Sequence, residues 1–211
     1  MLNFAADKKS VILKASFEVF ITYGFRKTSM DDIARAAGMS RPALYQSFKN
    51  KTDIFRALAT HFCEVSLSKA ETELKGKAGF DQRLMRAIEV SVIEMNAMME
   101  KTPHGMELMA VNDEIAHDLE EIWTSRFVAL LKDAFLDAND KGEINLSKVG
   151  ITAQEVAQVF DHTMEGLRTR CMRGEKINDA IYTVVRFFAG ALTAEPLPKT
   201  TDIKSVVAQI A

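Results

Sequence analysis

The chain has 211 residues, of which 47% are hydrophobic and 27% are charged, and its 4 prolines and 10 glycines exclude collagen-like and linker-rich architectures. The formal net charge of -2 is unevenly distributed, because residues 1–56 carry 10 basic and 5 acidic side chains whereas residues 57–211 carry 17 basic and 24 acidic ones. The resulting net charges of +5 and -7 favour a polyanionic partner for the first part alone.

Hydrophobic residues recur with a spacing of about 3.6 residues over the N-terminal part of the chain. The pattern predicts four helices, at about residues 8–23, 29–38, 40–47 and 50–73. Each of the last three begins at a serine or an asparagine, whose side chain accepts a hydrogen bond from a free backbone N–H group of the first turn. Each of the first two ends at a glycine, because glycine readily adopts the backbone conformation that follows a helix.

The remainder of the chain is also predicted to be helical. Amphipathic stretches cover about residues 80–100, 105–117, 119–139, 153–173 and 178–193, and a further short one is expected at 203–210. We find neither the alternating pattern of a β-strand nor an internal repeat. We therefore expect an all-α fold, with a three-helix N-terminal head and a larger helical body.

The sequence does not indicate an enzyme or a metalloprotein. It lacks a nucleophile–base arrangement and a phosphate-binding loop, and Asp137, Asn139 and Gly142 match only part of a calcium-binding loop, with lysines at two positions that need oxygen ligands. The 2 cysteines form no disulfide framework. No run approaches the roughly 18 apolar residues that cross a bilayer, and the first residues lack the pattern of a signal peptide. We expect a cytoplasmic protein without a cofactor, a metal or a membrane partner.

Residues 29–47 have the spacing of a helix-turn-helix motif. In such a motif Ile33 and Ala34, with Ala37, pack against Leu44 and Phe48, and the outward face of the second helix is free to enter the major groove of DNA. Pairs of short helices with a glycine turn also occur in bundles that bind no nucleic acid. The spacing alone therefore does not decide the function.

The string from Gly24 to Lys51, GFRKTSMDDIARAAGMSRPALYQSFKNK, resembles the N-terminal domain of the TetR/AcrR family of transcriptional regulators. It carries the family's Gly-Phe, Thr-Ser, Ile-Ala, Ala-Gly and Leu-Tyr pairs, and its phenylalanine and lysine, at the right spacing. The resemblance covers roughly residues 8–56, and the rest matches the family only in length and helical character. It implies a DNA-binding domain over residues 1–50 and an effector-binding and dimerisation domain over residues 51–211.

The resemblance also implies which residues contact DNA. Arg41, Pro42 and Ala43 lie at the front of the recognition helix, where Arg41 can bind a guanine and the other two can contact a thymine methyl group. The positions assigned to phosphates are Thr28, Ser29, Tyr45, Ser47 and Lys51, and those flanking the reading face are Arg35, Gln46 and Lys49.

Three features qualify these assignments. The alternative for Tyr45 is an aromatic residue that fills the core of the head, and the alternative for Lys51 is a solvated lysine at a helix end. Pro42 and Ala43 cannot donate hydrogen bonds from their side chains. Specificity therefore rests on Arg41, with Gln46, Arg35 and the shape of the DNA as further contributors.

For the body, the resemblance implies an effector pocket enclosed by the fourth to seventh helices. Methionines are concentrated there, beside two aromatic residues on the following helix: Met85, Met95, Met98, Met99, Met106, Met109, Trp123 and Phe127. Methionine suits a surface that repacks around varied apolar ligands, and it equally suits a plain core. Few lysines or arginines accompany the cluster, so we expect an apolar or amphipathic effector rather than a highly anionic one.

The resemblance further implies a homodimer that forms through the last two long helices, at 153–173 and 178–193. Apolar residues cover much of both helices, and small ones such as Gly166, Ala189 and Gly190 permit a close approach. Burial of these helices within one subunit is the alternative.

Taken together, these features predict a homodimeric, ligand-responsive repressor. It would bind a palindromic operator in double-stranded DNA and be released by a small apolar or amphipathic effector. A DNA-binding regulator that has no small-molecule effector, or that activates transcription, is the alternative, and the sequence does not separate the two.

Overall fold

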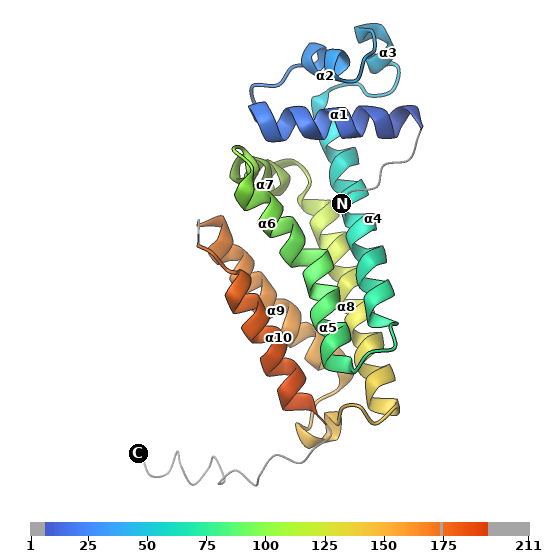
Figure 1. Ribbon diagram of the computed structural model, residues 1–211, viewed down its shortest axis with the longest axis vertical. Helices are drawn as coiled ribbons and strands as arrows, with labels where there is room; N and C mark the ends of the chain where they lie inside the picture. The colour runs from blue at the N-terminus through green and yellow to red at the C-terminus, as the bar shows by residue number, and fades with distance from the viewer. Residues whose placement is uncertain (1–6, 174, 194–211) are drawn as a thin grey trace.

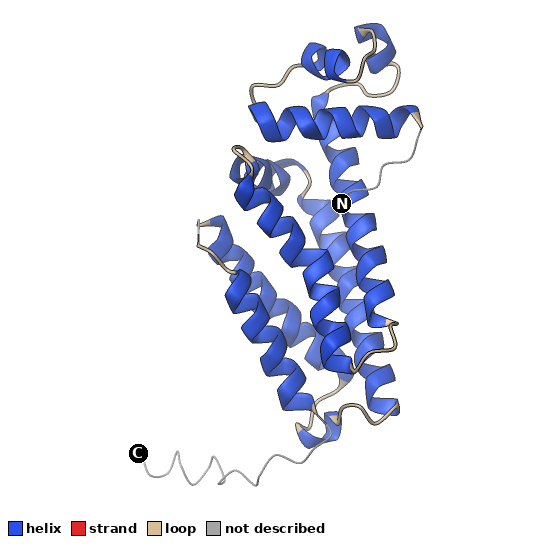
Figure 2. Ribbon diagram, viewed as in Figure 1, coloured by secondary structure: helices blue, strands red, loops and turns tan. Residues whose placement is uncertain are grey.

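The computed structural model describes residues 7–173 and 175–193, which fold into an all-α protein with an N-terminal head and a larger helical body (Figure 1). Figure 2 shows helices and loops and no strand in this part of the chain. The predicted fold class is therefore confirmed. Within the same residues, no helix is both long and apolar enough to span a bilayer. The stretch at 203–210 lies outside the described residues.

The head consists of α1 (Lys8–Tyr23), α2 (Met30–Ala36), α3 (Arg41–Tyr45) and the first turns of α4 (Lys51–Leu74). Each helix follows a residue whose side chain accepts a hydrogen bond from a free backbone N–H group, namely Asp7, Ser29, Ser40 and Asn50. The second helix ends before the predicted residue 38, because Gly38 has a φ of 65° and turns the chain toward α3.

The body contains the rest of α4 and six further α-helices of the described chain. These are α5 (Phe80–Ile88), α6 (Glu94–Lys101), α7 (Gly105–Ile115), α8 (His117–Asp140), α9 (Ala153–Met172) and α10 (Asn178–Leu192). A π-helical segment, Glu89–Ile93, joins α5 to α6, so the predicted helix at 80–100 contains one widened turn. A short 3-10 helix, Leu146–Lys148, lies between α8 and α9.

Two clusters of buried apolar side chains stabilise the chain. The body cluster is built around residues such as Leu131 and Phe160, and the head cluster around residues such as Phe20. Leu108 and Val111 of α7 belong to the head cluster, and α7 lies against α1 (Figure 1). Head and body therefore meet at a packed junction, which can transmit a displacement from one to the other.

Candidate DNA interface and ligand cavity

The helix-turn-helix motif of α2 and α3 is held together by its buried residues. Ile33 and Ala34 of α2 lie in one cluster with Leu44 of α3 and Phe48 of the following turn, as their spacing predicts. Leu44 is fully buried and fixes the inner side of α3. The opposite side of α3 therefore faces solvent.

This solvent side carries the residues that the sequence assigns to base reading and its flanks. Arg35, Arg41, Pro42, Tyr45, Gln46 and Lys49 are exposed, whereas Ala43 and Ser47 are half-buried. Tyr45 is 42% exposed and lies on the surface, so it does not fill the core of the head.

Arg41 is oriented by two neighbours. Its Nη1 lies 3.1 Å from Oδ2 of Asp31, and its guanidinium lies 5.5 Å from the centroid of the Tyr45 ring. Both side chains of the ion pair are more than half exposed, so the pair is screened by solvent and contributes little. Arg41 can therefore leave Asp31 and bind the edge of a base at a small cost in free energy.

Thr28 and Ser29 make local hydrogen bonds that fix the start of α2. The buried Thr28 hydroxyl donates to the carbonyl oxygen of Gly24 at 2.6 Å. The Ser29 hydroxyl donates to Oδ2 of Asp32 at 2.6 Å and accepts from the Asp32 backbone N–H at 3.2 Å. Neither hydroxyl has a hydrogen left to donate to a phosphate unless these contacts rearrange.

Lys51 is tied to the loop between α1 and α2. Its Nζ donates to the carbonyl oxygens of Phe25 at 2.8 Å, Arg26 at 3.1 Å and Thr28 at 3.0 Å, and it lies 4.6 Å from the centroid of the Phe25 ring. Burial lowers the pKa of Lys51. An ammonium group has three donors, so the contacts of Lys51 with the loop occupy all of them.

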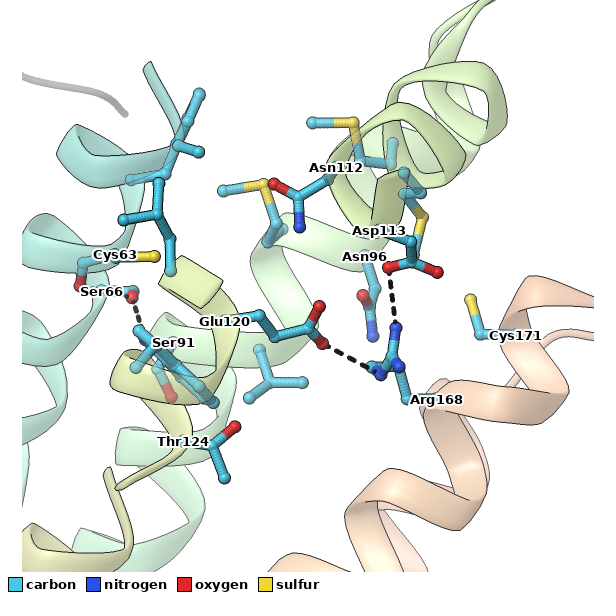
Figure 3. A pocket seen from close by; sticks show the side chains of 18 of the residues that line it. Cys63, Ser66, Ser91, Asn96, Asn112, Asp113, Glu120, Thr124, Arg168 and Cys171 are labelled. Atoms are coloured by element: carbon cyan, nitrogen blue, oxygen red, sulfur yellow. Dashed lines mark hydrogen bonds and ion pairs between the residues drawn. The ribbon is translucent and has the colours of Figure 1, made fainter. Parts of the chain in front are cut away.

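A cavity of about 300 Å³ lies in the body and reaches the head. Its wall is formed by side chains of α4, the π-helical segment and the helices α6 to α10, and Figure 3 shows part of this wall from close by. Phe17 and Phe20 of α1 also line it. The head and the cavity therefore share a wall.

The predicted effector residues divide into two groups. Met95, Met99, Met109, Trp123 and Phe127 line the cavity. Met85 packs instead against the body cluster, Met98 packs against the head cluster, and Met106 is exposed. Methionine enrichment identifies the region, but it does not indicate which side of each helix turns inward.

Trp123 is fixed on the cavity wall by two contacts. Its ring stacks on Phe127, with centroids 4.7 Å apart and an interplanar angle of 12°. Its indole N–H donates to the Ser66 hydroxyl at 2.7 Å. The indole face is thus held rigidly at the cavity, which makes Trp123 a local reporter of cavity occupancy.

One part of the wall carries charged side chains, as Figure 3 shows for Arg168, Asp113 and Glu120. Arg168 of α9 lies 3.1 Å from Asp113 of α7, 3.0 Å from Glu120 of α8 and 2.9 Å from Glu165. These contacts, led by the hydrogen bond to Glu165, raise the pKa of Arg168. Nowhere in the described chain are three His, Cys, Asp or Glu side chains placed to hold a metal ion.

The effector residues predicted from the sequence include neither this charged group nor the phenylalanines of α1. One signal for Arg168 was present, because it follows Met164 by four residues and therefore lies on the apolar side of its helix. No comparable signal exists for Phe17 and Phe20, whose apolar side is explained by packing within the head.

A second set of contacts connects the head to α7 and α8. Glu107 of α7 accepts a hydrogen bond from the backbone N–H of Arg26 at 3.0 Å, which lowers the pKa of Glu107. Arg56 of α4 makes two hydrogen bonds of 2.7 Å to Asp118 and one of 2.6 Å to the carbonyl oxygen of Ile115. The loop before α2 is thus attached to α7, which also lines the cavity.

The helices α9 and α10 lie together on one flank of the body (Figure 1). Their outer side exposes apolar side chains. Phe187 is 70% exposed and Val159 is 51% exposed, and a Cβ atom added at Gly166 or Gly190 would meet no neighbouring element within 4 Å. Most other apolar residues of these helices, such as Phe160 and Val185, are buried within the subunit. The predicted apolar stripes therefore divide between the core and the surface.

The exposed Arg41 lies on a short helix that packs through buried side chains against the helix before it, and the helical body below contains a cavity. These features define a helix-turn-helix DNA-binding protein. Residues 12–58 match the model of the bacterial regulatory proteins of the tetR family. The chain belongs to this family.

Its relatives are DNA-binding regulators. Over 92% of this chain and 87% of the relative, it is 29% identical to the HTH-type transcriptional activator FasR of Mycolicibacterium smegmatis. A transcriptional regulator from Cytophaga hutchinsonii superimposes with a TM-score of 0.73 at 18% identity, over 88% of this chain and 98% of that one. SmeT, the repressor of the Stenotrophomonas maltophilia multidrug efflux pump SmeDEF, has a TM-score of 0.65 at 18% identity, over 92% and 98%, and SmeT is also known in complex with triclosan.

Proposed function

We propose that this transcriptional regulator is a homodimeric repressor, released from a palindromic operator by a small apolar or amphipathic molecule in the cavity. The observation that supports this most is the shared wall between cavity and head. Phe20 lines the cavity and also packs against Phe25 and Phe55 in the head, with ring centroids 5.3 and 6.0 Å apart. A molecule that fills the cavity therefore touches the helix that supports α2 and α3.

In this proposal residues 1–50 bind DNA, and residues 51–211 bind the effector and dimerise. Helix α3 enters the major groove, with Arg41 on a guanine and the exposed side chains around it on flanking bases and phosphates. Such a regulator acts where the DNA is, so we place it in the cytoplasm.

The dimer forms when the outer sides of α9 and α10 pack against their symmetry mates. The exposure of Phe187 and Val159 supports this arrangement, since both would be buried in a four-helix interface. Two recognition helices in a dimer must lie about 34–36 Å apart, or a multiple of that distance, to read successive major grooves. An effector then acts by favouring a state of the body in which this separation is wrong.

The test begins with an operator, selected from random duplexes by the purified protein. Hydrophobic compounds that raise the melting temperature are then titrated with Trp123 fluorescence, with and without the operator. If the compound releases the operator, each must lower the protein's affinity for the other by the same factor. We expect a coupling free energy of about 1–3 kcal/mol. Compounds that bind equally well in both conditions would contradict ligand-induced release.

A second candidate function is activation of transcription. The relative FasR supports this candidate, because it is named a transcriptional activator. The same titration separates the two candidates in part. A compound that strengthens operator binding indicates a co-repressor or an activating ligand, whereas one that weakens it indicates induction. In vitro transcription from a promoter that carries the selected operator then gives the sign of regulation.

A further inference from the structure

The charges on the cavity wall are strongly biased toward one sign. Four carboxylates line the cavity, from Asp113, Glu120, Asp161 and Glu165, against one cation, Arg168. The formal charge of these described wall residues is therefore -3. A cavity with such a wall favours a positively charged occupant, and it disfavours an anion.

Arg168 does not provide a free site for an anionic ligand. Its guanidinium already makes charge-assisted contacts with Asp113, Glu120 and Glu165, and the contact with Glu165 uses both Nε and Nη2, at 2.9 and 3.0 Å. A carboxylate or phosphate on a ligand would have to displace one of these partners and leave it unpaired among like charges. That exchange is unfavourable.

Glu120, by contrast, has bonding capacity to offer. Its Oε1 contacts Arg168, but its Oε2 is shielded from solvent and has no hydrogen-bond partner among the described residues. Burial raises the pKa of Glu120 and that of Asp161, so both carboxylates are partly desolvated at the cavity. A cation beside them would restore the interactions that their charges have lost with water.

Glu120 is the most buried of the three carboxylates around Arg168. Its side chain is 21% exposed, against 37% for Asp113 and 54% for Glu165. Trp123 lies three residues after Glu120 on α8 and thus on the same side of that helix. Apolar side chains, with Phe62 and Met95 among them, form much of the rest of the wall.

We propose that the effector is an amphipathic cation, an alkyl- or arylammonium compound whose positive head lies against Glu120 and whose apolar tail lies along Trp123. An indole face beside a carboxylate suits such a head, because it adds a cation–π contact to the ion pair. This inference rests on the proposed ligand-dependent function, and it narrows the chemical class of the ligand.

The test compares three probes with the same ten-carbon tail: decyltrimethylammonium, decanol and decanoate. Each is titrated below its critical micelle concentration into the full-length protein, and binding is followed by Trp123 fluorescence. We expect decyltrimethylammonium to bind more tightly than decanol, and decanol more tightly than decanoate, with at least a tenfold difference between the two charged probes. Equal or tighter binding of decanoate would overturn the inference.

The variant Glu120→Gln keeps the shape of the side chain and removes its charge. It should lower the affinity for decyltrimethylammonium by about 10- to 100-fold and leave the affinity for decanol within about threefold. The retained affinity for decanol also shows that the variant folds. Glu71→Gln is the matched control, since Glu71 is an acidic residue of α4 that pairs with Lys75 on the surface. Unchanged affinity of Glu120→Gln for decyltrimethylammonium would assign the cation to another place.

A parallel titration in the presence of operator DNA separates the two proposals. If decanol or decanoate binds best and releases the operator, the proposed function holds and the cationic class is wrong. If decyltrimethylammonium binds best but leaves operator affinity unchanged, the ligand class holds and ligand-induced release is wrong. If none of the three probes binds, the cationic class is wrong, and the screen of hydrophobic compounds described above decides ligand-induced release.

Discussion

Gly24 occupies the sharp turn at the end of α1, where its backbone has a φ of 84° and a ψ of 154°. This combination is essentially restricted to glycine. A Cβ atom there would also lie 2.9 Å from Nδ1 of His104 and would overlap the carboxylate of Glu107. Both residues belong to the junction between head and body, so a side chain at position 24 would strain the backbone and push α7 away from the loop.

We predict that Gly24→Ala lowers the free energy of unfolding by more than about 2 kcal/mol. Gly38→Ala is the matched control, because Gly38 also has a positive φ, of 65°, but has nothing within 4 Å of the added atom. Strain alone should cost the control about 1 kcal/mol. Urea unfolding at one fixed protein concentration measures both. An equal decrease in the free energy of unfolding of both variants would show that α7 accommodates the added Cβ atom without cost.

Arg41 is the strongest bidentate donor at the start of the recognition helix, and its exposed pair with Asp31 is readily exchanged. We predict that Arg41→Ala costs about 1–3 kcal/mol of discrimination at one base pair in each half-site. Lys49→Ala serves as the control for loss of a nearby exposed charge. The measurement is a competition between the selected operator and single-base variants. Equal loss of affinity for operator and random DNA would identify Arg41 as a phosphate contact.

At the scale of elements, the α1–α2 loop depends on Lys51, whose Nζ bonds three of its carbonyl oxygens. We predict that Lys51→Met, which keeps the apolar stem, destabilises the head by about 1–3 kcal/mol and weakens DNA binding. The slope of log K against log salt should stay unchanged. If Lys51 contacts a phosphate instead, the slope falls by about 1. Hydrogen exchange in residues 25–30, with the salt titration, distinguishes the two roles.

The elements themselves were largely predictable from the sequence, because their ends are set by local chemistry. Ser29, Ser40 and Asn50 each cap the helix that follows them, as their residue types predict. The reading helix was predictable for the same reason, since its residues are contiguous. The π-helical segment Glu89–Ile93 was not, because a shift in backbone hydrogen bonding leaves no mark in the hydrophobic pattern.

The cavity was predictable only as a region. Its charged residues come from α7, α8 and α9, and the partners of Arg168 are as far away in sequence as Asp113. Helical periodicity shows which residues of one helix share a side. It does not show which sides of different helices face each other, so neither the acidic wall nor the role of Phe17 could be derived from it.

At the scale of the whole molecule, the proposed dimer depends on the outer sides of α9 and α10. Phe187 is 70% exposed there, the most exposed large apolar side chain among the described residues. In a twofold symmetric interface each residue occurs twice. Burial of a phenylalanine contributes about 1.5–3 kcal/mol, so the pair contributes about 3–6 kcal/mol.

We predict that Phe187→Asp raises the dimer dissociation constant by about 10²- to 10⁴-fold, because it removes this burial and places two carboxylates in an apolar interface. Sedimentation velocity over a range of concentrations measures the shift. Ile122→Asp is the matched control, since it charges an exposed apolar residue of α8. The monomer should also lose most of its operator affinity, since one head reads only one half-site. A Phe187→Asp protein that remains dimeric would place the interface elsewhere on the body.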